Sequence, residues 1–286
     1  MDLTNINEIK TLLSRHGFRF SKSKGQNFLT AAWVPEDIAD AAGLDGQTGV
    51  LEIGPGIGCL TEQLSERAGK VVSVELDTAL RPVLEETLAG RNNVEIVYGD
   101  ALKLNIPKLL DEKMPGMRHV VCANLPYNVT GPVISKLLKC RCFDSVTVMI
   151  QREVARRICA RPGTGEYGEF TVFVNWYARP EMLFDVPPDC FIPQPKVTSS
   201  VIRLDCRVSP PVEIKSEAMF MRVVRAAFAQ RRKTLLNALS TGFGELSKDE
   251  VEKCLLDSGF DPKVRGEVLS IGEFAKIADA FFTVLD

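Results

Sequence analysis

A glycine-rich segment that joins an apolar run to a helix-forming stretch constrains the fold of this chain more than any other feature. The segment is Gly54-Pro55-Gly56-Ile57-Gly58, after the apolar residues 49–53 and before a stretch of helical character at 60–68. Glycine permits a tight turn and a close approach of the backbone to a ligand. The N-terminus of a helix binds negatively charged groups of a ligand favourably. The segment therefore predicts a strand, a turn that faces a ligand, and a helix. A tight turn without a ligand is the alternative.

Apolar runs and helical stretches alternate on both sides of this turn. Such βαβ alternation predicts an α/β fold, a doubly wound, Rossmann-like parallel sheet with helices on both faces. The apolar segments 170–177 and 198–204 are expected as late strands that form an antiparallel pair at one edge. The other predicted strands are 49–53, 71–75, 94–97, 120–123 and 145–150, and the helices are 3–17, 35–42, 60–68, 79–88, 132–139 and 152–160.

The pattern changes after Arg207, where Ser209-Pro210-Pro211 reads as a linker. Beyond it only helical stretches follow, at 216–228, 232–239, 248–258 and 271–285. We therefore expect residues 1–207 to form the sheet domain and residues 208–286 a smaller, all-helical domain.

Composition narrows the class of protein. Hydrophobic residues make up 45% and charged residues 25% of the 286 residues, as in an ordinary globular protein. No stretch approaches the roughly 18–20 apolar residues of a membrane span, and residues 1–10 lack the apolar core of a secretory signal. We expect a cytoplasmic protein without a membrane association.

Cysteine and histidine usage argues against a metal site. The eight cysteines are expected to be reduced, buried small hydrophobes, because no secretory signal is visible. Cys140-Arg141-Cys142 lacks the Cys-x-x-Cys spacing of zinc and redox sites, and His16 and His119 are the only histidines. Neither a zinc site nor a Cys–His nucleophile is expected, so the chemistry should depend on a bound cofactor.

Two acidic residues follow successive predicted strands. Glu75 ends the second strand, 21 residues after Gly54, where a carboxylate can accept both hydroxyls of a ribose. Asp100 follows the third strand and can accept from an adenine amine. A surface glutamate and a helix-capping aspartate are the alternatives. With the glycine turn, the two predict a nucleoside site at the switch point of the sheet.

Asn124-Leu125-Pro126-Tyr127 follows the apolar run 117–123, at the carboxyl end of another predicted strand. Amide and carbonyl oxygens accept N–H bonds, and an aromatic ring stacks on a flat base. This set suits a clamp that holds a nitrogen base by its exocyclic amine. A plain exit from a strand into a turn is the alternative.

The net charge of −2 hides an uneven distribution. Residues 1–30 hold five basic residues against two acids, with a basic segment at 15–24, whereas residues 31–110 hold six against thirteen. Phosphate affinity depends on local basic surface. Residues 219–240 contain no acid, and their basic side chains are candidates for contact with RNA phosphates. A solvated helix face is the alternative. The basic residues are Arg222, Arg225, Arg231, Arg232 and Lys233.

These motifs resemble S-adenosylmethionine-dependent methyltransferases, and among them the ribosomal RNA adenine N6-dimethyltransferases, most closely the bacterial small-subunit (16S) branch. The resemblance covers roughly residues 8–280. Its motifs are Gly25–Leu29, Gly54–Gly58, Val74–Asp77, Gly99–Ala101, Asn124–Asn128, Phe191–Val197 and Phe228–Leu235.

The resemblance implies methyl transfer from S-adenosyl-L-methionine, leaving S-adenosyl-L-homocysteine, to N6 of two adjacent adenines near the 3′ end of 16S rRNA. The substrate would be the 30S subunit or its precursor during ribosome biogenesis, and the enzyme a monomer. It implies cofactor contacts from Asn27, Leu29, Gly54, Glu75, Asp100 and Asn124. Asn27 and Leu29 would lie on an N-terminal lid over the methionine end. One departure is Thr30-Ala31, where family members often carry an acidic residue.

The clamp then receives catalytic roles. The Asn124 side-chain oxygen and a carbonyl of Leu125 or Pro126 would accept the two N–H bonds of the adenine amine. Tyr127 would stack on the base, and Phe191 would cover its other face. A loop hydrophobe that fills the core is the alternative for Phe191.

Four other classes of function stay open. DNA adenine and protein glutamine methyltransferases share a related Asn/Asp-Pro-Pro-Tyr, but position 125 is leucine. Dimethylation of large-subunit RNA shares the motifs. An RNA-binding assembly factor without catalytic activity would need only a vestigial pocket. The presence of Glu75, Asp100 and Asn124 argues against a vestigial pocket. A nicotinamide oxidoreductase would require glycine at position 59, which is cysteine.

Overall fold

The computed structural model describes residues 1–18 and 25–285, so most of the basic segment predicted at 15–24 lies outside the described residues. The chain forms two compact units. The first comprises residues 1–155 and 178–206, and the second comprises residues 156–177 and 207–286. None of the described helices is long and apolar enough to cross a membrane.

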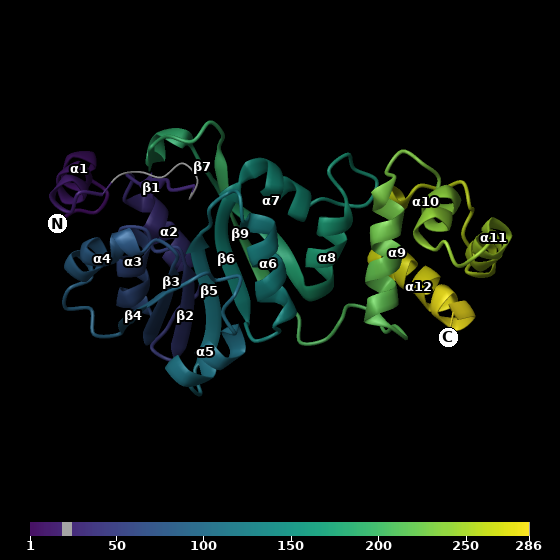
Figure 1. Ribbon diagram of the computed structural model, residues 1–286, viewed down its shortest axis with the longest axis horizontal. Coiled ribbons are helices and arrows are strands. Elements are labelled where there is room, and N and C mark those ends of the chain that lie inside the picture. The colour runs from purple at the N-terminus through teal and green to yellow at the C-terminus, as the bar shows by residue number, and fades with distance from the viewer. Residues whose placement is uncertain (19–24, 286) are drawn as a thin grey trace. The chain divides into compact units, whose positions relative to one another are not determined.

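The first unit is built on a seven-stranded sheet with the order β4-β3-β2-β5-β6-β9-β7 (Figure 1). Strands β2 to β6 are parallel, whereas β9 runs antiparallel to β6 and β7 antiparallel to β9. The order reverses between β2 and β5, which makes that crevice the switch point. The strands are β2 (Thr48–Ile53), β3 (Lys70–Glu75), β4 (Val94–Tyr98), β5 (Arg118–Asn124), β6 (Ser145–Gln151), β7 (Ala178–Val186) and β9 (Ser199–Cys206).

Helices cover both faces of this sheet, because its central strands are apolar on both sides. All six residues of β2 are buried. Val50 and Val71 pack in one core cluster with side chains of α1 to α4, while their neighbours Leu51 and Val72 point to the opposite face. The doubly wound α/β prediction is confirmed. The helices of this unit are α1 (Ile6–Arg15), α2 (Trp33–Ala41), α3 (Cys59–Arg67), α4 (Arg81–Thr87), α5 (Ile106–Lys113) and α6 (Thr130–Lys139), and α7 (Arg152–Ile158) begins in it.

A separate two-stranded sheet joins the N-terminal segment to the Pro-rich loop. Strand β1 (Phe28–Leu29) pairs antiparallel with β8 (Phe191–Ile192), with Leu29 opposite Phe191. The backbone N–H of Thr30 also donates to the carbonyl of Cys190, at 2.8 Å. This pairing ties the predicted cofactor lid to the loop that carries Phe191.

The strand predicted at 170–177 is wrong, because these residues form helix α8 (Glu169–Tyr177). Strand β7, directly after it, is the partner of β9 at the sheet edge. The β-branched and aromatic composition of the segment favours a strand, but tertiary packing overrides that preference. Trp176 is completely buried and stacks on Phe220, with ring centroids 4.3 Å apart.

The second unit is helical, around a core that includes Trp176, Phe220, Phe243, Phe274 and Phe281. One boundary between the units lies between residues 206 and 207, one residue before the boundary expected after residue 207. Residues 156–177 also belong to the second unit, whereas the sequence analysis assigned them to the first domain. The chain passes from the first unit to the second inside α7 and returns between α8 and β7. At neither point does the sequence have the composition of a linker. Its remaining helices are α9 (Glu217–Ala229), α10 (Leu235–Gly242), α11 (Lys248–Asp257) and α12 (Ile271–Leu285).

Candidate active site

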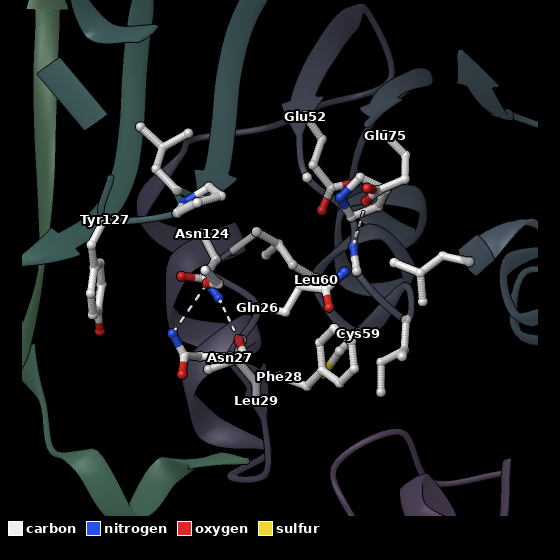
Figure 2. Close-up of a pocket in the computed structure, with 18 residues that line it drawn as sticks. Gln26, Asn27, Phe28, Leu29, Glu52, Cys59, Leu60, Glu75, Asn124 and Tyr127 are labelled. Carbon is white, nitrogen blue, oxygen red and sulfur yellow. Dashed lines mark hydrogen bonds between the residues drawn. The ribbon is translucent and has the colours of Figure 1, made fainter. Parts of the chain in front are cut away.

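A pocket opens at the carboxyl ends of β2, β3 and β5, the switch point of the sheet (Figure 2). Its empty space, including the part that is open to solvent, is about 740 Å³. The structure brings eight of the predicted site residues together in its lining: Asn27, Leu29, Gly54, Glu75, Asn124, Leu125, Pro126 and Tyr127.

The glycine-rich turn forms one wall of the pocket. Gly54 and Gly56 have φ of 75° and 60°, in the left-handed region that favours glycine. A Cβ atom on Gly56 would lie 3.1 Å from two ring carbons of Phe28, so a side chain at this position would require the Phe28 ring of the lid to shift. The predicted strand, turn and helix are confirmed.

Glu75 points into the pocket from the end of β3 and also supports the glycine turn. Its Oε2 accepts from the N–H of Gly56 at 3.4 Å (Figure 2). Its Oε1 accepts from the N–H of Asp77 at 2.6 Å. Burial raises the pKa of this carboxyl. Each carboxylate oxygen can accept more than one hydrogen bond, so Glu75 keeps capacity for hydroxyl donors of a ligand.

Asp100 lies one strand away from Glu75 and does not line the pocket. The N–H of Gly99 donates to the carbonyl of Glu75 at 2.9 Å, which places Asp100 just beyond that contact. Its Oδ1 accepts from the N–H of Leu102 at 2.9 Å, and its Oδ2 is 3.7 Å from Nζ of Lys103. The carboxylate thus caps a turn, and its contact with a cofactor stays a prediction.

Glu52 is a pocket residue that the sequence reasoning missed. It is fully buried, and its Oε2 accepts from the hydroxyls of Thr61 at 2.7 Å and Ser73 at 2.6 Å. Burial raises its pKa to about 7. A signal was present in the sequence, because a carboxylate inside the predicted strand 49–53 requires a specific partner or a function if that strand is buried.

Replacing Glu52 by glutamine is expected to remove a pH dependence of stability. A carboxyl whose pKa is raised on folding contributes stability that is full below about pH 4.5 and is lost as the pH rises through about 7. The unfolding free energy of the wild type should therefore fall by about 3 kcal/mol more than that of E52Q from about pH 5 to about pH 8. Urea unfolding at both pH values measures this difference. Equal pH dependence in the two proteins would show that Glu52 is charged in the fold.

The N-terminal segment lies across the pocket and is held at both sides. Gln26 Nε2 donates to Oδ2 of Asp77 at 2.9 Å, near Glu75. On the other side, Asn124 Nδ2 donates to the backbone carbonyl of Asn27 at 3.3 Å (Figure 2). Leu29 is buried and anchored by the β1–β8 pair. The segment therefore has the position of the expected lid.

Asn124-Leu125-Pro126-Tyr127 leaves β5 at the pocket. The carbonyl of Pro126 accepts from the N–H of Val129 and the hydroxyl of Thr130, both at 3.2 Å. Within residues 1–18 and 25–285, no donor contacts the Leu125 carbonyl. The sequence analysis proposed the carbonyl of Leu125 or of Pro126 as an acceptor for the adenine amine. Of these two, the Leu125 carbonyl is the one that can still accept a hydrogen bond from a ligand.

Tyr127 is half-buried, and its hydroxyl hydrogen bonds to Oγ of Ser199 at 2.6 Å. Burial raises the pKa of the phenol, so the ring is neutral. Because the hydroxyl is held on β9, the ring is fixed in the pocket lining beside Asn124 (Figure 2). The tetrapeptide thus presents an amide, a carbonyl and a ring to one cavity.

Phe191 does not line the pocket. Its side chain is 3% exposed and belongs to the core cluster that contains Leu29, its partner in the β1–β8 pair. This position agrees with the alternative role of Phe191, a loop hydrophobe that fills the core. Stacking of Phe191 on a base stays a prediction.

The five basic residues proposed for RNA differ in their surroundings within the second unit. Three of them are engaged. Arg222 lies 2.7 Å from Glu245 and over the ring of Phe243, and Arg225 lies 3.6 Å from Glu169. Arg231 lies 3.1 Å from Glu267 and donates to the carbonyl of Gly165.

Arg232 and Lys233 are the two that keep exposed side chains without an ion pair among the described residues. They lie in the turn between α9 and α10, where residues 229–233 line a shallow depression.

All eight cysteines are free, but the expectation of burial holds only in part. Cys59, Cys122, Cys190 and Cys254 are buried, and the other four are half-buried. Within the described ranges, no group of three or more His, Cys, Asp and Glu side chains is arranged to hold a metal ion.

Comparisons with known proteins match this geometry. A family model described as "Ribosomal RNA adenine dimethylase" matches residues 17–281. The Ribosomal RNA small subunit methyltransferase A of Geobacillus sp. (strain WCH70) is 46% identical, with 99% of each chain covered.

Two solved structures extend the likeness to the fold. A dimethyladenosine transferase from Plasmodium falciparum gives a TM-score of 0.73 at 26% identity, covering 87% of this chain and 95% of that one. The 23S rRNA methyltransferase ErmE gives 0.66 at 27% identity, covering 88% and 98%.

Proposed function

This chain belongs to the ribosomal RNA adenine dimethylase family, and on that premise we propose that its pocket dimethylates N6 of two adjacent adenines near the 3′ end of 16S rRNA. The chain is an S-adenosylmethionine-dependent adenine methyltransferase of small-subunit rRNA. One observation carries the assignment of the site. The Asn124–Tyr127 turn opens into the same cavity as Glu75 and the glycine turn, so an amine acceptor set and a nucleoside site share one space.

The residues of the pocket fit S-adenosyl-L-methionine, which supplies an electrophilic methyl group on a sulfonium when bound. Glu75 offers carboxylate oxygens to ribose hydroxyls, and the backbone at Gly54 permits close approach. Asn27 and Leu29 close the pocket from the lid. Asp100 would reach the adenine amine of the cofactor from the turn after β4.

The chain's contribution to the transfer is positioning and electrostatics. The lone pair of an adenine amine is delocalised into the ring, which makes it a poor nucleophile. If the Asn124 side-chain oxygen and the Leu125 carbonyl accept its two N–H bonds, the nitrogen can pyramidalise and present its lone pair. Tyr127 holds the base by stacking, and in-line attack follows without a dedicated base. Phe191 would cover the second face of the base.

The target adenine has to leave its stack to enter such a pocket, which costs a few kcal/mol and favours unpaired adenines. Small-subunit RNA is favoured over large-subunit RNA by likeness: the relative named for the small subunit is 46% identical, whereas ErmE is 27% identical. We propose a cytoplasmic monomer that acts on the 30S subunit or its precursor.

RNA phosphates are proposed to contact chiefly Arg232 and Lys233 of the helical domain, because within residues 1–18 and 25–285 these two have no ion pair that RNA would have to break. The R232A/K233A variant should lower the magnitude of the log–log salt slope of RNA binding by about 1.4–1.8, as expected for two lost phosphate contacts. Titration of 16S rRNA fragments at several salt concentrations measures it.

The matched control for this prediction is R222A/R225A, which removes the same charge from two side chains that already have acidic partners. Its salt slope should change by less than half as much. If both double variants had the same slope, net charge and not the α9–α10 turn would explain the binding.

The proposed activity is tested with 30S and 50S subunits from a strain that lacks adenine dimethylation and with labelled S-adenosylmethionine. Label should enter 30S particles, and mass spectrometry should map it to N6,N6-dimethyladenine at two neighbouring positions. Label confined to 50S particles would contradict the small-subunit assignment, and binding of the cofactor without any transfer would favour the assembly-factor alternative.

A further inference from the structure

Cys140 and Cys142 form a close thiol pair at the corner between α6 and β6, outside the pocket. Their Sγ atoms lie 2.8 Å apart, and both side chains are half-buried. Arg141 between them has φ of 51°, in the left-handed region, and is the only such non-glycine residue among those described. A left-handed residue folds the chain back sharply, which brings its two neighbours to the same side.

The surroundings of the pair activate one of the two thiols. The contact with Cys142 lowers the pKa of Cys140 to about 7, with a smaller contribution from Lys136 on the preceding turn of α6. The same contact raises the pKa of Cys142. A cysteine that is partly exposed and partly ionised near neutral pH is reactive, in contrast to a buried structural cysteine.

A third thiol lies nearby but is less reactive. Cys206 ends β9, its backbone N–H donates to the carbonyl of Asp144, and its electrostatic neighbours are Cys140, Asp144 and Asp205. Burial raises its pKa to about 12. Cys206 therefore serves as an internal reference for a thiol in the same region that should not react.

We propose that Cys140 and Cys142 are a redox-active dithiol that low-molecular-weight disulfides oxidise to an intramolecular disulfide. The Cys140 thiolate attacks one sulfur of the small disulfide, forms a mixed disulfide and expels a thiolate. Cys142 then loses its proton and attacks the sulfur of Cys140, which forms the Cys140–Cys142 bond and expels the second thiolate. Two protein thiols are oxidised, one small disulfide is reduced to two thiols, and their protons pass to the expelled thiolates.

Two measurements on the wild-type protein test the assignment. After treatment with glutathione disulfide, two of the eight thiols should become inaccessible to alkylation, and peptide mapping should place both at Cys140 and Cys142. Without oxidant, iodoacetamide at pH 7 should label Cys140 at least about tenfold faster than Cys206, because the contact with Cys142 lowers the pKa of Cys140 whereas burial raises that of Cys206. Retention of both thiols, or equal labelling rates, would overturn the proposal.

Three variants separate the steps. C142S lacks the resolving thiol, so it should accumulate one glutathione adduct at Cys140, and C140S should form neither adduct nor disulfide. C206S is the matched control and should form the disulfide as the wild type does. Loss of the disulfide in C206S, with C142S still forming one, would show that Cys206 and not Cys142 is the partner and would overturn the pair. Circular dichroism of each variant verifies the fold.

Discussion

Asn124→Ala is expected to lower methyl transfer by about 10³-fold while the protein keeps its fold. The reason is that the side-chain oxygen is one of only two acceptors proposed for the adenine amine, and loss of one preorganised polar partner typically costs about 10²–10³-fold in rate. The side chain also donates to the carbonyl of Asn27 at 3.3 Å, so its loss loosens the lid. Single-turnover transfer of labelled methyl groups to undermethylated 30S particles measures the effect.

Two further variants make this test specific. Asn124→Asp keeps an acceptor oxygen but cannot donate to Asn27, so it should retain more activity than the alanine variant if acceptance of the amine dominates. Asn105→Ser, at the start of α5, keeps a competent helix cap and should leave transfer unchanged. Near-wild-type transfer by Asn124→Ala would show that the Leu125 carbonyl alone positions the amine, and the proposed clamp would be abandoned.

Glu75→Ala is expected to weaken S-adenosylmethionine binding by about 10²-fold, with KM rising much more than kcat falls. A carboxylate that accepts from neutral donors contributes about 1.5–3 kcal/mol, or roughly 10–100-fold in affinity. The substitution also leaves the N–H groups of Gly56 and Asp77 without an acceptor, which should loosen the glycine turn and bring the loss to the upper end of that range. Isothermal titration calorimetry measures the affinity.

The control is Glu85→Ala, which removes an exposed carboxylate from α4 and should leave affinity within about twofold. Thermal unfolding of both variants shows whether the folded state persists at the temperature of the titration. An unchanged dissociation constant in Glu75→Ala would place the ribose elsewhere in the pocket, and Glu52 would then become the carboxylate to examine.

Much of the site could be predicted because its parts are local. The glycines of the turn, the acid that ends β3 and the tetrapeptide that ends β5 each lie at the carboxyl end of a strand. Parallel strands of one sheet bring such ends to the same edge, so the strand pattern alone predicts that they meet. The eight pocket residues found by sequence reasoning all belong to these segments or to the lid.

What the sequence did not predict has a common physical cause, which is long-range packing. The segment 170–177 has the composition of a strand, yet it is a helix because Trp176 is buried against Phe220, far along the chain. The pairing of Phe191 with Leu29, which buries its side chain, could not be read from the sequence either, and its stacking on a base stays a prediction. The ion pair of Arg231 with Glu267 and its bond to the carbonyl of Gly165 are long-range contacts of the same kind, and its contact with RNA stays a prediction.

The sequence by itself determined the class of fold, the five parallel strands of the sheet, the position of the pocket and the family, because these follow from periodicity and short motifs within each segment. Only the tertiary structure decided that Glu52 is a buried carboxyl of the pocket, that the Leu125 carbonyl is the free acceptor, and that Cys140 and Cys142 meet. Burial, hydrogen-bond partners and pKa values depend on atoms from distant segments, and these neighbours exist only once the chain has folded.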